Sequence, residues 1–407
     1  MILNYKGKKS EKEIFENTKE CNLVSVKGNQ NSESKLIKGE NLDVMKYLID
    51  KKRLEGKIDL VYIDPPFATK NVFHISEDKA NSISRCHSDN IAYDDSLTGA
   101  KYLEFIRERL ILIRKLMSKK SSIYFHIDYK IGHYIKVLMD EIFGEKNFIN
   151  DISRIKCNPK NFNRKAFGNV KDSILFYSKA GKYIWNEQKF SFPKEDIERL
   201  FRKVDKDGRK YTTIPVHAPG ETQNGVTGQP WRGMMPPKGR HWRSGPNVLD
   251  ELDKQGLIEW SKTGVPRKKI FADEKDGKKI QDILEFKDSQ NPSYPTEKNL
   301  DLLKLLVKTS SDKDSIVLDC FCGSGTTLKA AQSLGRKWIG VDKSGEAIKV
   351  ALKRLTHKQT SSFSEKDFEY LEQKENSPAW ERKKNGEFVG RHRRDANYQG
   401  ANQPSLF

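Results

Sequence analysis

Four consecutive residues, Asp64, Pro65, Pro66 and Phe67, carry the strongest chemical signal in the sequence. They follow a run of strand-forming residues, 58–63, so a buried strand is expected to end at a carboxylate. Proline fixes φ and lacks an N–H, so the two prolines orient their carbonyls rigidly and add no donor that competes for nearby acceptors. The Asp64 carboxylate and the Pro65 carbonyl are therefore candidate acceptors for substrate N–H groups, beside an aromatic ring.

A second candidate site is the segment IVLDCFCGSGTTLKAAQSLGRKWIGVDKS, which indicates a strand, a glycine-rich turn, a helix, a strand and an acid. Gly323 and Gly325 let the backbone approach a ligand closely, and Asp342 is placed to bind a ribose diol. A dinucleotide fingerprint would need glycine where Leu328 stands, and the Gly-Lys-Ser/Thr of a P-loop is missing. The pattern favours an adenosyl ligand without a pyrophosphate, namely S-adenosylmethionine. The alternative is an ordinary strand-to-helix turn.

Three motifs then occur in a characteristic order: DPPF at 64–67, YPTEKN at 294–299 and FCGSG at 321–325. With them the chain resembles, over residues 34–355, the permuted β group of site-specific DNA amino-methyltransferases of the N6-adenine/N4-cytosine family. The resemblance implies an α/β fold with a Rossmann-like, seven-stranded, mainly parallel sheet, circularly permuted and carrying an inserted target-recognition region. Cys320, Tyr294 and Asn299 depart from the family pattern and are expected to tune cofactor affinity.

The resemblance also implies roles for individual residues. Asp64 and Pro65 would accept the N–H groups of an adenine or cytosine amine, whose lone pair is delocalised into the ring. Phe67 would stack on the base after it is flipped out of the duplex. S-adenosylmethionine would be bound by a set drawn from several segments: Gly39, Asn41, Thr296, Lys298, Asp319, Phe321, Gly323, Ser324, Gly325, Thr326 and Asp342.

The expected reaction is direct, in-line methyl transfer to adenine N6 in duplex DNA. Aspartate at position 64 favours adenine, because cytosine-N4 members of the family more often carry serine there. Cytosine-N4 transfer is the close alternative, and a catalytically inactive specificity subunit is a third, which the intact Asp64 disfavours. Methylation at cytosine C5 needs a Pro-Cys pair, and no Cys in the sequence follows a Pro.

Helical and strand patterns alternate over much of the chain, as in a doubly wound parallel sheet. We expect five parts: an N-terminal extension (1–33), a catalytic half (34–180), a target-recognition insertion (181–290), a cofactor-binding half (291–356) and a basic C-terminal tail (357–407). The extension is expected to be irregular or accessory. Residues 68–98 have little periodicity and are expected to form a long loop that acts as an active-site lid.

The insertion is dense in Gly, Pro, Trp and Arg around QPWRGMMPPKGRHWR. Arginine can contact guanine bidentately in the major groove, so the expected DNA-binding residues are Trp231, Arg232, Arg240, Trp242 and Arg243. The alternative is a small basic subdomain in which the tryptophans are simply the core.

The chain of 407 residues carries a formal net charge of +19 and a sequence pI near 9.4, which favours a nucleic-acid partner. Five cysteines without a framework-like spacing, and an N-terminus without an apolar signal segment, indicate a reducing, cytoplasmic location. A membrane span is not expected, because the apolar runs are too short. A metal site is not expected either, since Cys86-His87 has no second pair at ligand spacing.

Expected partners are duplex DNA, a restriction endonuclease and a second copy of the chain in a homodimer. The last five residues, QPSLF, resemble the peptide that binds bacterial sliding clamps, with Gln403 at the pocket rim and Leu406 and Phe407 inside it. The alternative for this segment is a tail that folds back onto the catalytic domain.

Overall fold

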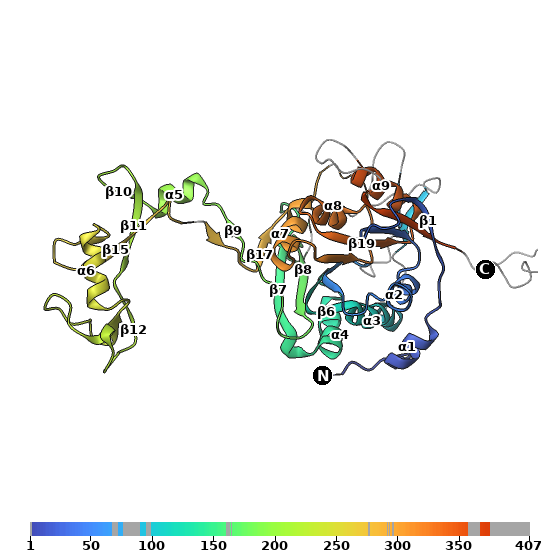
Figure 1. Ribbon diagram of the computed structural model, residues 1–407, viewed down its shortest axis with the longest axis horizontal. Coiled ribbons are helices and arrows are strands. Elements are labelled where there is room, and N and C mark those ends of the chain that lie inside the picture. The colour runs from blue at the N-terminus through green and yellow to red at the C-terminus, as the bar shows by residue number, and fades with distance from the viewer. Residues whose placement is uncertain are drawn as a thin grey trace, which may run out of the picture.

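The computed structural model describes residues 2–66, 72–75, 90–94, 99–159, 163, 165–275, 277–290, 292, 294, 297–356 and 367–374. Figure 1 shows a body built around one large sheet and, at a distance, a smaller distal lobe. A narrow arm joins the two, and in it the outgoing strand β9 (Lys189–Phe190) pairs antiparallel with the returning strand β16 (Lys278–Lys279).

The body contains seven strands in the expected mainly parallel arrangement. In spatial order these are β2 (Lys35–Lys38), β19 (Lys337–Asp342), β18 (Ile316–Asp319), β3 (Ile58–Ile63), β6 (Met117–Ile127), β8 (Lys171–Ser178) and β7 (Phe148–Ile155). The first five are parallel to one another, and β8 runs antiparallel to both of its neighbours. The strand prediction for 58–63 is confirmed at both ends.

The prediction of seven strands was too low, because the sheet has ten strands in the described residues. β20 (Glu369–Gln373) adds to β2, β1 (Leu23–Gly28) adds to β20, and β17 (Ile283–Glu285) adds to β7. These three strands come from the segments that the sequence assigned to the tail, the extension and the insertion. None of the three is a run of apolar residues, so the sequence did not mark them as strands of the sheet.

Helices cover both faces of the sheet (Figure 1). One face packs against α2 (Asn41–Asp50), α3 (Gly99–Leu116) and α4 (Gly132–Phe143), and the other against α7 (Leu300–Ser310), α8 (Thr326–Ser333) and α9 (Gly345–Thr356). Alternate residues of β3 belong to the two cores: Val61 and Ile63 to the first, Leu60 and Tyr62 to the second. A strand buried on both faces needs apolar residues at successive positions, which is why the sequence is uninterrupted by charge from Leu60 to Ile63.

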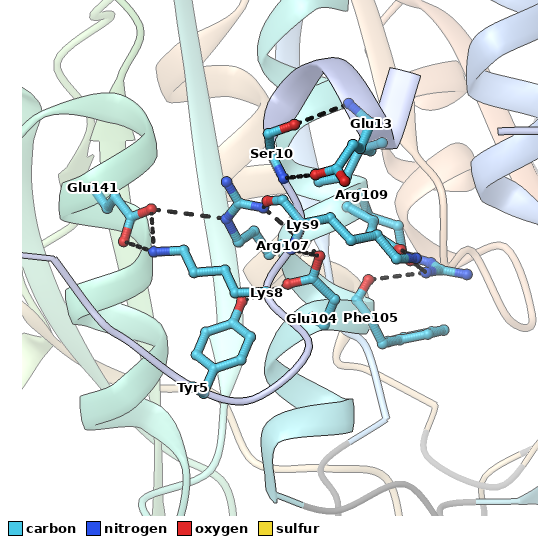
Figure 2. A network of polar contacts seen from close by, with 12 residues as sticks. Tyr5, Lys8, Lys9, Ser10, Glu13, Glu104, Phe105, Arg107, Arg109 and Glu141 are labelled. Carbon is cyan, nitrogen blue, oxygen red and sulfur yellow. Dashed lines mark hydrogen bonds and ion pairs between the residues drawn. The ribbon is translucent and has the colours of Figure 1, made fainter. Parts of the chain in front are cut away.

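The N-terminal segment is ordered rather than irregular, and it is fastened to α3 and α4 (Figure 2). Tyr5 Oη donates to Glu104 at 2.7 Å, Lys8 pairs with Glu141 at 2.8 Å, and Lys9 pairs with Glu108 at 2.6 Å. The short helix α1 (Glu11–Asn17) follows, and its N-cap Ser10 forms a capping box with Glu13. The extension therefore belongs structurally to the body.

The distal lobe has its own sheet, β10 (Lys203–Val204), β11 (Lys210–Pro215), β15 (Pro266–Phe271) and β14 (Ile258–Trp260). The hairpin of β12 (His217–Pro219) and β13 (Arg240–Trp242) and the helix α6 (Pro246–Lys254) complete it, and α5 (Lys194–Leu200) precedes it. Its separate core consists of Val216, Trp231, Trp242, Leu249 and Ile258.

Within the expected lid, the structure describes the backbone of two strands, β4 (Val72–Ile75) and β5 (Asn90–Asp94), which pair antiparallel. The remainder of 68–98 lies outside the described residues, as does the tail beyond residue 374 with Gln403–Phe407. None of the helices in the described residues is both long and apolar enough to cross a bilayer.

Strand β20, which lies between β1 and β2, provides a test of the fold. Lys35 on β2 and Glu369 on β20 are buried and form an ion pair at 2.5 Å. Lys35→Met should lower the free energy of unfolding by about 3–5 kcal/mol, because it leaves a buried carboxylate uncompensated. Urea denaturation would measure the change, and the double variant K35M/E369L should recover most of it.

A matched control lies along the same two strands. Lys38 and Glu372 are half-exposed and 3.5 Å apart, so Lys38→Met should change the free energy of unfolding by less than about 1 kcal/mol. Equal effects of K35M and K38M would show that β20 does not bury the first pair.

Candidate functional site

Four loops meet at one edge of the sheet, where parallel strands end. Asp64 follows β3, Asp319 ends β18, Asp342 ends β19 and Gly39 follows β2. The strands are in register, since Leu318 pairs with Val61 and Asp342 pairs with Lys38. Residues 64–66 and the FCGSG turn therefore lie beside each other, at the kind of edge where open α/β sheets bind ligands.

Asp64 is oriented by a lysine from another motif. Lys298 Nζ lies 2.5 Å from Asp64 Oδ2, and both side chains are largely buried, with 12% and 16% of their surface exposed. The other oxygen, Oδ1, is buried and has no hydrogen-bond partner among the described residues. A buried unpaired carboxylate oxygen costs free energy, so it marks a position where a donor is needed.

Two further acids lie at the same edge. Burial raises the pKa of Asp319 to about 7, and the charges of Asp64 and Asp342 add to the effect. Hydrogen bonds from Thr327 and from the Phe321 N–H act in the opposite direction. Burial also raises the pKa of Asp342. Three carboxyl groups thus gather in a poorly solvated place, where a positively charged ligand would stabilise their ionised forms.

The glycine turn is shaped by its two glycines. Gly323 has φ +48°, and a Cβ added there would meet nothing within 4 Å, so the backbone borders open space. Its N–H donates to Asp342 Oδ2 at 2.9 Å, which joins the turn to the neighbouring strand. Gly325 has φ +75° as the N-cap of α8, and a Cβ there would approach Ala351 Cβ to 3.0 Å. Glycine is therefore required at 325 by conformation and packing together.

Asn41 lies behind the turn. Its Nδ2 donates to the Cys320 carbonyl at 2.8 Å, and its Oδ1 accepts from Arg109 Nε at 2.6 Å. Arg109 also stacks on Phe105, whose ring lies 6.1 Å from that of Phe321 (Arg109 and Phe105 are shown in Figure 2). Sequence reasoning missed Arg109, because a lone arginine in an amphipathic helix carries no motif.

Gly39 is constrained by the C-terminal strand. A Cβ at this position would lie 2.7 Å from Gln373 Oε1, which accepts the Glu40 N–H at 2.8 Å. The Gly39 N–H donates to the Asp342 carbonyl at 3.0 Å. Gln373 of β20 was not expected near the site, since the sequence placed it in the tail.

Ser324 and Thr326 are buried and bonded to a residue that the sequence did not indicate. Arg354 on α9 donates to Ser324 Oγ at 2.9 Å and to Thr326 Oγ1 at 2.5 Å. Tyr294, one of the departures from the family pattern, is buried, and burial followed by the charge of Asp342 raises its pKa to about 12.

The buried His126 on β6 contacts polar side chains on both neighbouring strands, β3 and β8. Its Nδ1 lies 2.8 Å from Tyr62 Oη and its Nε2 lies 3.3 Å from Asp172. Burial lowers the pKa of His126, so the ring is neutral near pH 7. Burial alone would raise the pKa of Asp172, but His126 and Lys156 hold it well below its usual range. These contacts link β3, β6 and β8 close to Asp64 and so support the sheet there.

The expected DNA-binding set in the distal lobe needs correction. Trp231 and Trp242 are buried, at 1% and 3% exposure, and their rings pack edge to face at 5.9 Å. They form the lobe core, which was the alternative interpretation, because so small a lobe needs large apolar side chains to exclude water. Arg232 is paired with Asp250 at 3.0 Å and Asp253 at 2.6 Å, so its charge is compensated within the lobe.

Arg240 and Arg243 remain candidates, and the structure adds Arg267. Arg240 lies 3.3 Å from His217 Nδ1, Arg243 donates to the Pro215 carbonyl, and Arg267 donates to Thr213. Burial, and then these three arginines in that order, lower the pKa of His217, so the three positive charges gather around one residue. None of the three forms an ion pair with a described carboxylate.

Two expected site residues, Phe67 and Thr296, lie outside the described residues. Pro65 is buried and Pro66 is half-buried. Within the part of the chain that the structure describes, His, Cys, Asp and Glu side chains do not gather in threes as metal ligands would.

Comparison with known proteins identifies the family. The family model for DNA methylases of the N6/N4 type matches residues 58–353. The chain belongs to this DNA methylase family. It is therefore a DNA methyltransferase that acts on adenine N6 or cytosine N4, and the cofactor of the family is S-adenosylmethionine, as the sequence predicted.

Curated relatives agree with this assignment. The chain is 42% identical over 364 residues to the type II methyltransferase M.EcaI of Enterobacter cloacae, covering 87% of this chain and 77% of the relative. It is 27% identical over 351 residues to the Mod subunit of the type III restriction-modification enzyme StyLTI of Salmonella typhimurium, covering 76% and 51%.

Solved structures of DNA methyltransferases are more distant. The cytosine-N4-specific PvuII DNA methyltransferase aligns with a TM-score of 0.45 and 13% identity, covering 83% of this chain and 92% of that chain. The complex of M1.HpyAVI with S-adenosylmethionine aligns with a TM-score of 0.40 and 17% identity, covering 79% and 100%.

The raised pKa of Asp319 predicts a pH dependence of stability. The folded state binds this proton more tightly than the unfolded state, whose pKa is near 3.8, so this group makes stability fall between about pH 4 and pH 7. In Asp319→Asn that contribution is absent, and the thermal midpoint should change less from pH 5 to pH 7.5 than in the wild type.

The exposed Asp207 of the distal lobe offers the matched substitution. Asp207→Asn should keep the wild-type pH dependence of the thermal midpoint. A D319N variant that loses stability with pH as steeply as D207N would show that Asp319 is ionised throughout.

Proposed function

We propose that the chain transfers the methyl group of S-adenosylmethionine to adenine N6 in duplex DNA, at a base flipped out of the helix. The observation that carries the proposal is the Asp64 carboxylate, with Oδ2 held by Lys298 and Oδ1 buried without a partner among the described residues. The aspartate favours adenine over cytosine by comparison with the family pattern. Cytosine-N4 transfer is the alternative, and the geometry suits either amine.

The chemistry requires acceptors rather than a strong base. Asp64 Oδ1 and the Pro65 carbonyl would each accept one amine N–H, which draws the nitrogen lone pair out of conjugation and towards the methyl group. Asp64 would take up the proton that the methylated nitrogen releases. Asp64 and Pro65 are fixed by the end of β3 and by the Lys298 contact, so positioning supplies much of the rate. Phe67 is proposed to stack on the flipped base, where stacking is worth about 1–3 kcal/mol.

The residues at the sheet edge suit the cofactor. S-adenosylmethionine supplies a methyl group on a positively charged sulfur, and the three acids Asp64, Asp319 and Asp342 gather at the edge where it would bind. Asp342 is proposed to accept a ribose hydroxyl, and the backbone at Gly323 leaves room for the ligand. Thr296, Ser324 and Thr326 stay predicted cofactor residues, and Lys298 is better explained as the partner of Asp64.

Duplex DNA is proposed to contact the arginine cluster, which we define as Arg240, Arg243 and Arg267. Three arginines close together without a described carboxylate partner repel one another, and phosphates would relieve that repulsion. We also propose that this lobe recognises the target sequence, because the insertion stands where members of the family carry their target-recognition region.

Partner proteins are proposed by comparison. StyLTI Mod is named as a subunit of a restriction-modification enzyme, so we propose a restriction endonuclease as a partner of this chain. The homodimer and the clamp contact through Gln403–Phe407 stay predictions of the sequence.

Asp64→Asn is the direct test of the reaction. It keeps the shape and removes the charged acceptor, so methyl transfer should fall by a factor of about 100 or more, while DNA affinity stays within about threefold because it rests on phosphate contacts. Transfer of labelled methyl groups to DNA and a filter-binding assay would measure the two. Mass spectrometry of the digested DNA would identify N6-methyladenine, and N4-methylcytosine would select the alternative.

The arginine cluster predicts a salt dependence. Each of Arg240→Ala, Arg243→Ala and Arg267→Ala should reduce the slope of log affinity against log salt by about 1, as expected for one lost phosphate contact. Arg209, paired with Asp273 and Glu274 in the same lobe, is the matched control, since Arg209→Ala changes the net charge equally. Slopes that change equally in all four variants would exclude a local contact.

A further inference from the structure

Arg354 lies between two segments that are far apart in the sequence. Its guanidinium donates to Ser324 Oγ at 2.9 Å and Thr326 Oγ1 at 2.5 Å, in the glycine turn. On its other side it pairs with Glu297 Oε1 at 2.5 Å. Both members of this ion pair are largely buried, with 16% and 20% of their side chains exposed.

Glu297 is next in the chain to Lys298, which pairs with Asp64. The two residues lie in a short, restrained segment: the Glu297 N–H donates to the Tyr294 carbonyl at 3.1 Å, and Asn299 caps α7 through Asp301 and Leu302. Because the two residues are adjacent in the chain, a shift of the Glu297 backbone would also shift Lys298. The ion pair at Glu297 therefore bears on the position of the Asp64 carboxylate.

We propose that Arg354 is a positioning residue for methyl transfer. This inference rests on the proposed function. One guanidinium holds the turn that borders the cofactor, and through Glu297 it holds Lys298 and hence Asp64. The guanidinium of Arg354 thus fixes the cofactor turn and the Asp64 carboxylate, which binds the target amine, relative to each other.

Arginine suits this position better than lysine would. Its five N–H donors lie in one plane and can serve two hydroxyls and a carboxylate at once, whereas an ammonium is a point charge on a flexible stem. Misplacement of a reacting group by about 1 Å can cost about 100-fold in rate. A positioning residue remote from the reacting atoms can therefore matter strongly.

Glu297→Gln is the decisive variant, because it removes the charge of the pair and leaves the bonds between Arg354 and the turn in place. We expect the single-turnover rate of methyl transfer, at saturating S-adenosylmethionine and DNA, to fall about 10-fold or more. The Kd for S-adenosylmethionine, measured by calorimetry, and the Kd for DNA should stay within about twofold.

Arg354→Met should lower the rate at least as much and also weaken S-adenosylmethionine binding, because it releases the turn as well. Arg354→Lys should restore part of the rate. The effects of E297Q and R354M should not add in the double variant, since both break one contact. Lys353→Met, an exposed neighbour on α9 with the same loss of charge, should behave as the wild type.

A wild-type rate in E297Q, with a normal thermal midpoint, would overturn the inference even if R354M failed to fold. A loss of S-adenosylmethionine affinity in R354M with an unchanged saturated rate would overturn it too, because Arg354 would then serve the turn alone. Absence of methyl transfer to DNA by the wild-type chain would instead overturn the proposed function.

Discussion

Burial of carboxyl groups at the end of a parallel sheet is the constraint on which this site depends. An acid follows β3, and acids end β18 and β19, all at the same edge, where burial keeps water from screening them. Asp319 responds by holding its proton up to about pH 7, while Asp64 is paired with Lys298. Lys298 therefore sets which oxygen of Asp64 is left for a donor.

The position of Lys298 depends in turn on how the chain returns from the distal lobe. After β17, Arg154 holds the Phe286 carbonyl at 2.9 Å and pairs with Asp288, and Asn299 donates to the Lys287 carbonyl at 2.8 Å. These contacts fasten the returning segment to the sheet before it reaches Glu297 and Lys298. The acceptor site is thus assembled from two parts of the body that the insertion separates in sequence.

The sequence predicted the parts of the fold that have strong local signals. The ends of β3 and of β19 followed from apolar runs that stop at acids, and the motifs brought Asp64 and Asp342 to one edge. Arg109, Arg354 and Gln373 could not be predicted, because their contacts are made between segments remote in sequence and follow no period. The edge strands β1 and β17 need little apolar patterning, and β20 carries charged residues at positions 369 and 372, so the sequence did not indicate these three strands.

The distal lobe illustrates the limit of composition as a guide to function. Tryptophan and arginine in one loop-rich stretch suited a DNA surface, yet Trp231 and Trp242 fill a core and Arg232 is neutralised by Asp250 and Asp253. Sequence gives residue types, whereas burial and pairing decide which charges remain available to a partner. In the distal lobe the available charges are those of Arg240, Arg243 and Arg267 around His217.

The pairing of β9 with β16 has a consequence for how such a chain can change over time. Because the polypeptide leaves and re-enters the body through two adjacent strands, and the lobe encloses its own core, the lobe can be replaced without opening the sheet. A substituted lobe of another size would need only the same two-stranded attachment. A different binding surface can thus arise by exchange of the whole distal lobe, while the residues that hold Asp64 stay unchanged.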